Sequence, residues 1–285
     1  MTGVVDDRAA AVPGTEPGSR NLLARVVAAL VLAPVTIAIA YAGGWWWAAL
    51  VTVAAIGLFV EWLTMVGALQ PPWTAVAGSA ALAAAGIAVA ANWGAAAAAM
   101  IAVGLVATML SSAASRAWVG GGVVYAGLAL VASVLVRHDA DFGLVALIFV
   151  LLVVWVTDIG AYFAGRGIGG PKLWPRVSPK KTWAGAVGGL AASLVVAGAA
   201  AAAGVGKTTT LLVLATALSV VSQLGDLFES AVKRNFGVKD SSHIIPGHGG
   251  LLDRLDGFVA AIVVAAVIGL VRGGVDGVGR GLLVW

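Results

Sequence analysis

The sequence contains no cysteine, few charged side chains and long stretches without any charge. Without cysteine, neither a disulfide framework nor a thiolate metal site or nucleophile is available. Only 11% of the 285 residues are Asp, Glu, Lys or Arg, whereas 61% are hydrophobic. Because soluble domains carry about 25% charged residues, this composition indicates an integral membrane protein. The small formal net charge of +4 gives no support for nucleic-acid binding.

Apolar runs long enough to cross a bilayer, about 20 residues each, recur along the whole chain. Interruptions by Gly, Pro and charged residues divide them into nine segments, at 23–42, 45–67, 73–91, 95–112, 118–136, 143–164, 184–205, 208–229 and 257–273. Their polarity does not alternate, so they predict helices rather than barrel strands. The expected fold is an all-α integral membrane protein, a polytopic bundle of about nine transmembrane helices.

Three regions follow from this pattern. Residues 1–20 are polar, contain Pro and Gly, and lack the features of a signal peptide, so we expect a disordered cytoplasmic tail. Residues 21–142 are expected to form N-terminal transmembrane helices that contribute only hydrophobicity. Residues 143–285 are expected to form a second transmembrane region, which carries two polar cytoplasmic loops at 165–183 and 230–256.

The distribution of Lys and Arg predicts the orientation in the membrane. With a cytoplasmic N-terminus, all but four of the seventeen Lys and Arg residues fall on the cytoplasmic side. The four exceptions are Arg137, Lys207, Arg272 and Arg280. Because cytoplasmic loops are enriched in Lys and Arg, we expect a multi-pass plasma-membrane protein with an external C-terminus.

Acidic side chains occur at the cytoplasmic ends of three predicted helices. Asp158 lies near the end of the sixth, Asp226 and Glu229 near the end of the eighth, and Asp253 and Asp256 at the start of the ninth. Carboxylates inside a membrane are unfavourable and usually face a wet cavity. Ion pairs are the alternative, Asp158 with Arg166 or Glu229 with Lys233, and helix capping could explain one of the last two acids.

The two polar loops carry nine of the seventeen cationic residues. Membrane anchoring or contact with anionic lipids would explain either loop alone. Acids and bases together favour a polar cytoplasmic cavity in which a hard divalent metal bridges phosphates and Lys or Arg holds the remaining oxygens. The glycine-rich turn "PGHGG", residues 246–250, offers backbone N–H groups close to a helix start, where anions bind well.

The second loop resembles the signature of the phosphatidate cytidylyltransferases, also called CDP-diacylglycerol synthases. The matching residues are Ser230, Lys233, Arg234, Lys239, Asp240, Ser242, Ile245, Pro246, His248, Gly249, Gly250, Asp253, Arg254 and Asp256. "SQLGDLFES" and "SPKKTWAG" are similar to further segments of that family. The resemblance implies an enzyme of phospholipid biosynthesis that joins CTP and phosphatidate in the lipid bilayer, giving CDP-diacylglycerol and pyrophosphate. It also implies a homodimer and a catalytic role for residues 143–285.

The resemblance and the chemistry assign roles to single residues. By resemblance, Asp226 and Asp253 are metal ligands, for Mg²⁺ with a second cation left open, and Ser178, Lys180, Lys181 and Thr182 contact the nucleotide. Asp158 fits the polar cavity on the CTP side. Further expected catalytic residues are Asp256, Lys239 and His248, where His248 either donates a hydrogen bond or orders the loop. Lys233, Arg234 and Arg254 are expected to hold the phosphatidate head group.

Two other functions remain open from the residues alone. A transporter or channel for an organic phosphate or a divalent cation is compatible with intramembrane acids, although the charges gather on one side of the membrane. Another CTP-dependent lipid enzyme, such as a polyprenol kinase, would need the same kind of cofactor site.

Overall fold

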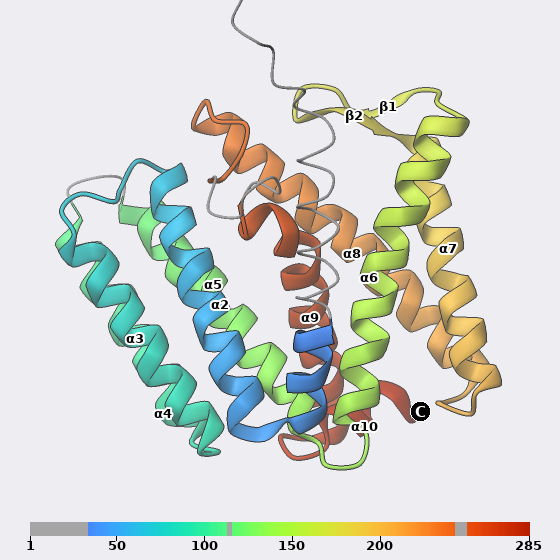
Figure 1. Cartoon of the computed structure of the whole chain (residues 1–285), viewed down its shortest axis with the longest axis horizontal. Coiled ribbons are helices and arrows are strands. Elements are labelled where there is room, and N and C mark those ends of the chain that lie inside the picture. Colours follow the sequence, from blue (N-terminus) through green and yellow to red (C-terminus); the bar gives the residue numbers. More distant parts are fainter. Residues whose placement is uncertain (1–33, 113–115, 243–249) are drawn as a thin grey trace, which may run out of the picture.

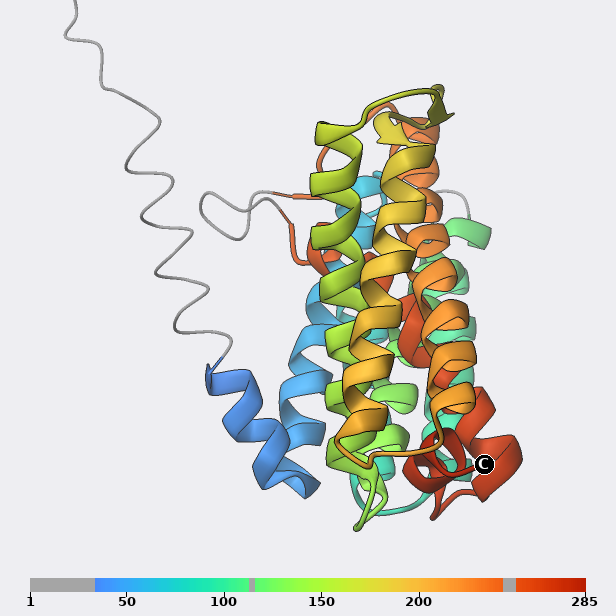
Figure 2. The same cartoon turned by 90° about the vertical axis from the view of Figure 1, so that its right-hand side faces the viewer.

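The computed structural model describes residues 34–112, 116–242 and 250–285, which form a bundle of long helices lying side by side (Figures 1 and 2). Residues 34–42 are helical, and ten further helices and strands follow them, together with a short C-terminal helix. In chain order these are α2 (Gly44–Met65), α3 (Trp73–Ala90), α4 (Gly94–Ser111), α5 (Arg116–His138), α6 (Gly143–Gly167), β1 (Lys172–Trp174), β2 (Ser178–Thr182), α7 (Trp183–Ala202), α8 (Thr208–Asn235), α9 (Leu252–Gly273) and α10 (Val278–Leu283).

Eight helices in the described part of the chain, α2 to α9, are long and apolar enough to cross a membrane. They correspond to eight of the nine predicted segments, and the fold class is confirmed. Most of the first predicted segment, 23–42, lies outside the described residues, as does the predicted tail 1–20.

Several helices continue beyond the ends of the predicted apolar segments. α8 extends to Asn235 instead of ending at 229, and α9 begins at Leu252 instead of 257. The charged side chains that interrupt the apolar runs favour these helix ends, because cations stabilise a C-terminal turn and carboxylates an N-terminal turn. Residues 230–235 and 252–256, expected in a loop, therefore lie on helices.

A β-hairpin replaces the featureless loop expected between α6 and α7. β1 and β2 pair antiparallel, and the N–H of Trp183 donates to the carbonyl of Pro171 at 3.1 Å, which closes the base of the hairpin. Thr182 then caps α7, because its Oγ1 accepts a hydrogen bond from the N–H of Gly185 at 3.1 Å. The hairpin is thus joined to the start of α7 at the end of the bundle (Figure 1).

Glycines let α6 and α7 approach closely beneath this hairpin. A Cβ at Gly189 would lie 2.6 Å from the carbonyl oxygen of Thr157, and one at Gly160 would lie 2.9 Å from that of Gly188. Such contacts are tighter than any side chain tolerates, so only glycine fits this helix crossing. The crossing fixes the hairpin relative to α6.

The two ends of the bundle differ in charge. We call the end that carries the hairpin, the end of α8 and the start of α9 the polar end (Figure 1). Arg137, Lys207, Arg272 and Arg280 lie at or near the other end, with α10, and every other Lys or Arg of the described residues lies towards the polar end. The structure therefore gathers the two predicted basic loops on one side.

Candidate functional site

Two cavities of different character meet at Asp158. One, of about 430 Å³, lies between α2, α5, α6 and α9 and is lined mainly by apolar side chains such as Trp47, Leu58, Trp155 and Phe258. Its ionisable lining residues are Asp158, Arg254 and Asp256. The second, of about 440 Å³, lies beneath the hairpin, and Asp158, Arg166, Lys180, Lys181, Gln223 and Asp226 contribute to its wall. We call them the apolar cavity and the polar cavity.

The hairpin brings cations to the polar cavity opposite an acid of α8. Lys181 forms an ion pair with Asp226, and both side chains keep partial contact with solvent. Lys180 and the cap residue Thr182 also line this cavity. Ser178, predicted to contact the nucleotide, is half-buried at the start of β2 and does not line it. The polar cavity therefore offers movable ammonium groups to an anionic ligand.

A close crossing of α8 and α9 places acids of the two helices near one another. A Cβ at Gly225, next to Asp226, would lie 2.8 Å from the carbonyl oxygen of Asp256. A Cβ at Gly257 would lie 3.1 Å from the carbonyl oxygen of Ser222. The Asp256 carboxylate consequently lies within electrostatic range of Asp226, Glu229 and Asp158.

These carboxylates fit a metal ion that is shared with phosphates. Among the described residues, no three acidic or histidine side chains are grouped so as to hold a metal ion by themselves. Mg²⁺ is typically held by one or two carboxylates, with substrate phosphates and water completing its coordination. Hard carboxylate oxygens from Asp226 and its neighbours on α9 match that requirement.

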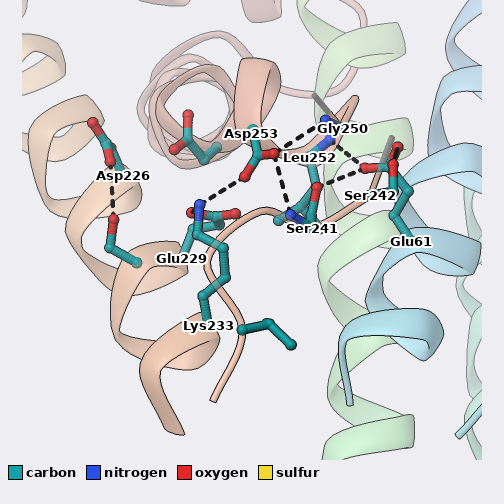
Figure 3. A network of polar contacts seen from close by, with 12 residues as sticks. Glu61, Asp226, Glu229, Lys233, Ser241, Ser242, Gly250, Leu252 and Asp253 are labelled. Carbon is teal, nitrogen blue, oxygen red and sulfur yellow. Dashed lines mark hydrogen bonds and ion pairs between the residues drawn. The ribbon is translucent and has the colours of Figure 1, made fainter. Parts of the chain in front are cut away.

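A buried ion-pair network joins α8 to α9 (Figure 3). The Nζ of Lys233 lies 2.6 Å from Glu229 Oε2 and 2.6 Å from Asp253 Oδ1. Asp253 Oδ2 also accepts hydrogen bonds from the N–H groups of Ser241, at 3.2 Å, and Gly250, at 3.1 Å. The ion pair of Glu229 with Lys233, which the sequence left as an alternative, is therefore present, whereas the N-cap residue of α9 provides no side-chain cap. The ammonium group predicted to hold the lipid phosphate faces two carboxylates instead.

The other predicted site residues are more scattered. Arg254 lines the apolar cavity. Arg234 is exposed, and its guanidinium donates to the carbonyl of Val238 at 2.9 Å. Lys239 is exposed in the segment between α8 and α9. His248 lies outside the described residues. Asp158 and Arg166 form no ion pair, although both are described and both line the polar cavity.

Glu61 of α2 is a buried polar residue that sequence reasoning missed. Glu61 is 0% exposed, and from the described residues of the polar end it accepts four hydrogen bonds, donated by Ser241 Oγ, Ser242 Oγ and the N–H groups of Leu251 and Leu252. The N-terminal helices therefore contribute a polar group to the polar end, where the sequence predicts no site residue among them. The signal was present, because Glu61 is the only charged residue between Arg25 and Arg116, and lone intramembrane charges indicate function.

The fold and the site together define a polytopic membrane protein with a charged site between a polar and an apolar cavity, as expected of an enzyme that joins a soluble substrate to a lipid. More specifically, the chain belongs to the cytidylyltransferase family, whose profile matches residues 23–271.

Several similar proteins are named phosphatidate cytidylyltransferase. The phosphatidate cytidylyltransferase of Brucella suis biovar 1 (strain 1330) is 41% identical over 257 residues, which cover 88% of this chain and 94% of that protein. Those of Haemophilus influenzae and Bacillus subtilis are 47% and 44% identical over 131 and 138 residues, covering 44% and 48% of this chain and 46% and 51% of their own lengths. The family resemblance drawn from the signature residues is confirmed.

Proposed function

We propose that this protein transfers the cytidylyl group of CTP to phosphatidate, giving CDP-diacylglycerol and pyrophosphate. Membership in the cytidylyltransferase family and the name shared by its relatives support this activity. The structural observation that carries it is the position of Asp158, which lines both cavities. A nucleotide in the polar cavity and a lipid in the apolar cavity would meet at this residue.

The lining of each cavity suits one substrate. Acyl chains fit the apolar cavity, where Trp47, Trp155 and Phe258 supply apolar surface and Arg254 supplies a cation for the lipid phosphate. A triphosphate fits the polar cavity, where Arg166, Lys180 and Lys181 line the wall together with Asp226. In this assignment a membrane-bound phosphate and a soluble nucleotide approach from opposite sides.

The reaction requires no covalent intermediate on the protein. A phosphatidate oxygen attacks the α-phosphorus of CTP, the bond from that phosphorus to the bridging oxygen of the β-phosphate breaks, and pyrophosphate leaves with the electron pair. The protein's contribution is to orient the two phosphates and to neutralise the leaving group. Lys181 can exchange its ion pair with Asp226 for the incoming triphosphate, and Lys180 supplies a second cation beside it.

We further propose a divalent cation, Mg²⁺ by the sequence prediction, held by Asp226 together with Asp253 or Asp256. Asp226 and Asp256 lie within electrostatic range of each other, whereas both oxygens of Asp253 already accept described hydrogen bonds. Bound there, the cation would neutralise charge on the α-phosphate and polarise its phosphorus.

The test is an activity assay on the purified full-length protein in phosphatidate-containing liposomes. Pyrophosphate release that needs both CTP and phosphatidate, stops with chelator and returns with Mg²⁺ is the expected result, with CDP-diacylglycerol identified by mass. Solute uptake without turnover would favour a transporter, and release of CDP with a phosphorylated polyprenol would favour a kinase. Either outcome would overturn the proposal.

The hairpin residues Lys180 and Lys181 should mainly affect the binding of CTP. Lys180→Ala combined with Lys181→Ala is expected to raise the KM for CTP by about tenfold or more, since two charge-assisted contacts to phosphate are lost. The KM for phosphatidate should change much less. Lys172→Ala with Arg176→Ala is a matched control, because both residues are exposed on the same hairpin and do not line the cavity. An unchanged CTP dependence would remove the assigned role.

The polar end should face the cytoplasm and the C-terminus the outside, as the Lys and Arg bias predicts. Because the chain has no cysteine, single cysteines can report topology without background. Val275→Cys, exposed near α10, should react with a membrane-impermeant maleimide on intact cells, whereas Arg176→Cys in the hairpin should react only after permeabilisation. The reverse pattern would refute this orientation.

The resemblance also implies a homodimer in the plasma membrane, and we keep both as part of the proposal. Light scattering of the detergent-solubilised protein, with the detergent contribution subtracted, would distinguish one copy from two.

A further inference from the structure

We propose that Glu61 is a positioning residue for the transfer reaction. In this role it ties the described parts of the segment between α8 and α9, residues 236–242 and 250–251, to α2 and so holds Asp253 and the start of α9 at the site. The inference rests on the proposed function for its kinetic consequence, while its structural part can be measured separately.

Glu61 holds the segment from both of its sides. Oε1 accepts from Ser242 Oγ at 2.6 Å and from the N–H of Leu251 at 2.8 Å. Oε2 accepts from Ser241 Oγ at 3.1 Å and from the N–H of Leu252 at 2.8 Å. Each oxygen thus receives one donor from before and one from after residues 243–249. A single carboxylate therefore holds Ser241 and Ser242 next to the start of α9.

Ser241 links Glu61 directly to Asp253. Its hydroxyl donates to Glu61 and its backbone N–H donates to Asp253 Oδ2. Asp253 in turn pairs with Lys233, so a continuous path of polar contacts runs from α2 to α8 (Figure 3). A change at Glu61 should consequently alter the position of Asp253, although Glu61 lines neither cavity.

The energetics favour a specific role over simple helix packing. Glu61 lies four residues from the C-terminal end of α2, where an acid is less unfavourable than at the centre of a membrane helix, but a buried carboxylate still needs compensating donors. Glu61 forms no ion pair with any described Lys or Arg residue, so the four donated hydrogen bonds supply that compensation. The surroundings of the Glu61 carboxylate are also tightly packed, since a Cβ added at Gly250 would lie 2.6 Å from Glu61 Oε2.

Glu61→Gln tests the kinetic part with almost no change in size. The amide nitrogen would face donors that now meet a carboxylate oxygen, so the segment should shift. We expect kcat to fall on the order of 10- to 100-fold, as small misplacements of catalytic groups do, with the KM for CTP nearly unchanged. Glu61→Asp keeps the charge and should restore part of kcat. If Glu61→Gln does not fold, the double variant Ser241→Ala with Ser242→Ala should also lower kcat, with the KM for CTP nearly unchanged.

Asp139 provides a matched control at the other end of the bundle. It is also a buried acid that accepts backbone hydrogen bonds at helix starts, from Phe142 at 2.9 Å and from Arg280 at 2.7 Å. Asp139→Asn should lower stability about as much as Glu61→Gln but leave kcat unchanged. Equal loss of kcat in both variants would show a merely structural role and overturn the inference.

A distance measurement tests the structural part without activity. Spin labels at Thr64→Cys on α2 and Asp240→Cys in the segment, both exposed, should give a narrow distance distribution that broadens or shifts in the Glu61→Gln background. An unchanged distribution would overturn the inference even if activity fell. If the unsubstituted protein made no CDP-diacylglycerol while the distribution still broadened, the proposed function would fail and the structural role of Glu61 would stand.

Discussion

Replacing Asp226 by Asn is expected to lower CTP turnover on the order of 10³-fold, the scale seen when a charge-positioning group is removed from a phosphoryl-transfer site. The amide has nearly the same shape but carries no negative charge to hold a cation or to orient Lys181. Asp226 is partly exposed, and its partners among the described residues are Lys181 and Ser230, so the fold should tolerate the change. Initial rates at saturating CTP and phosphatidate, over a range of Mg²⁺ concentrations, measure the effect.

Replacing Asp253 or Asp256 by Asn distinguishes which of these two residues holds the proposed metal ion together with Asp226. Asp253→Asn should reduce both activity and stability, because it disrupts the pairing with Lys233. Asp256→Asn should mainly change the Mg²⁺ concentration needed for half-maximal rate if Asp256 shares the ion. Asp240→Asn, an exposed acid of the same signature, serves as the control. Near-normal rates in Asp226→Asn and in both α9 variants would remove the metal site from the proposal.

Replacing Lys233 by Met is expected to destabilise the protein by about 3–5 kcal/mol, the range for breaking a buried ion pair by removing one partner. The Lys233 side chain is 11% exposed, and its loss leaves Glu229, 1% exposed, and Asp253, 15% exposed, as two nearby uncompensated carboxylates. The free energy of unfolding, from titration with SDS in mixed micelles, measures the effect.

Two comparisons isolate the cause of that instability. Glu229→Gln removes one of two acids and leaves Lys233 paired with Asp253, so its effect should be smaller than that of Lys233→Met. Arg234→Met removes the neighbouring cation, which is exposed and donates only to a backbone carbonyl in the described contacts. Stability as low in Arg234→Met as in Lys233→Met would show that general charge loss at the helix end, not the buried network, is responsible.

The helices were predictable because the hydrophobicity of each segment by itself shows that the segment lies in lipid. Lipid demands internally hydrogen-bonded, apolar segments of a fixed length, and eight such segments appear where they were expected. The ends were less predictable, as α8 and α9 show, because charged residues end an apolar run without ending a helix. The short hairpin was missed since its strands hold few apolar residues and depend on the closure at Pro171 and Trp183.

The sequence by itself determined that this chain spans a membrane, that its cations gather on one side, and that residues 230–257 carry a cytidylyltransferase signature. The tertiary structure decided which charges face one another. It paired Lys233 with Asp253, set Asp256 near Asp226, opened two cavities at Asp158 and joined Glu61 to a segment about 180 residues away. Hydropathy and local spacing act along one helix, whereas these contacts arise only where helix packing brings distant segments together.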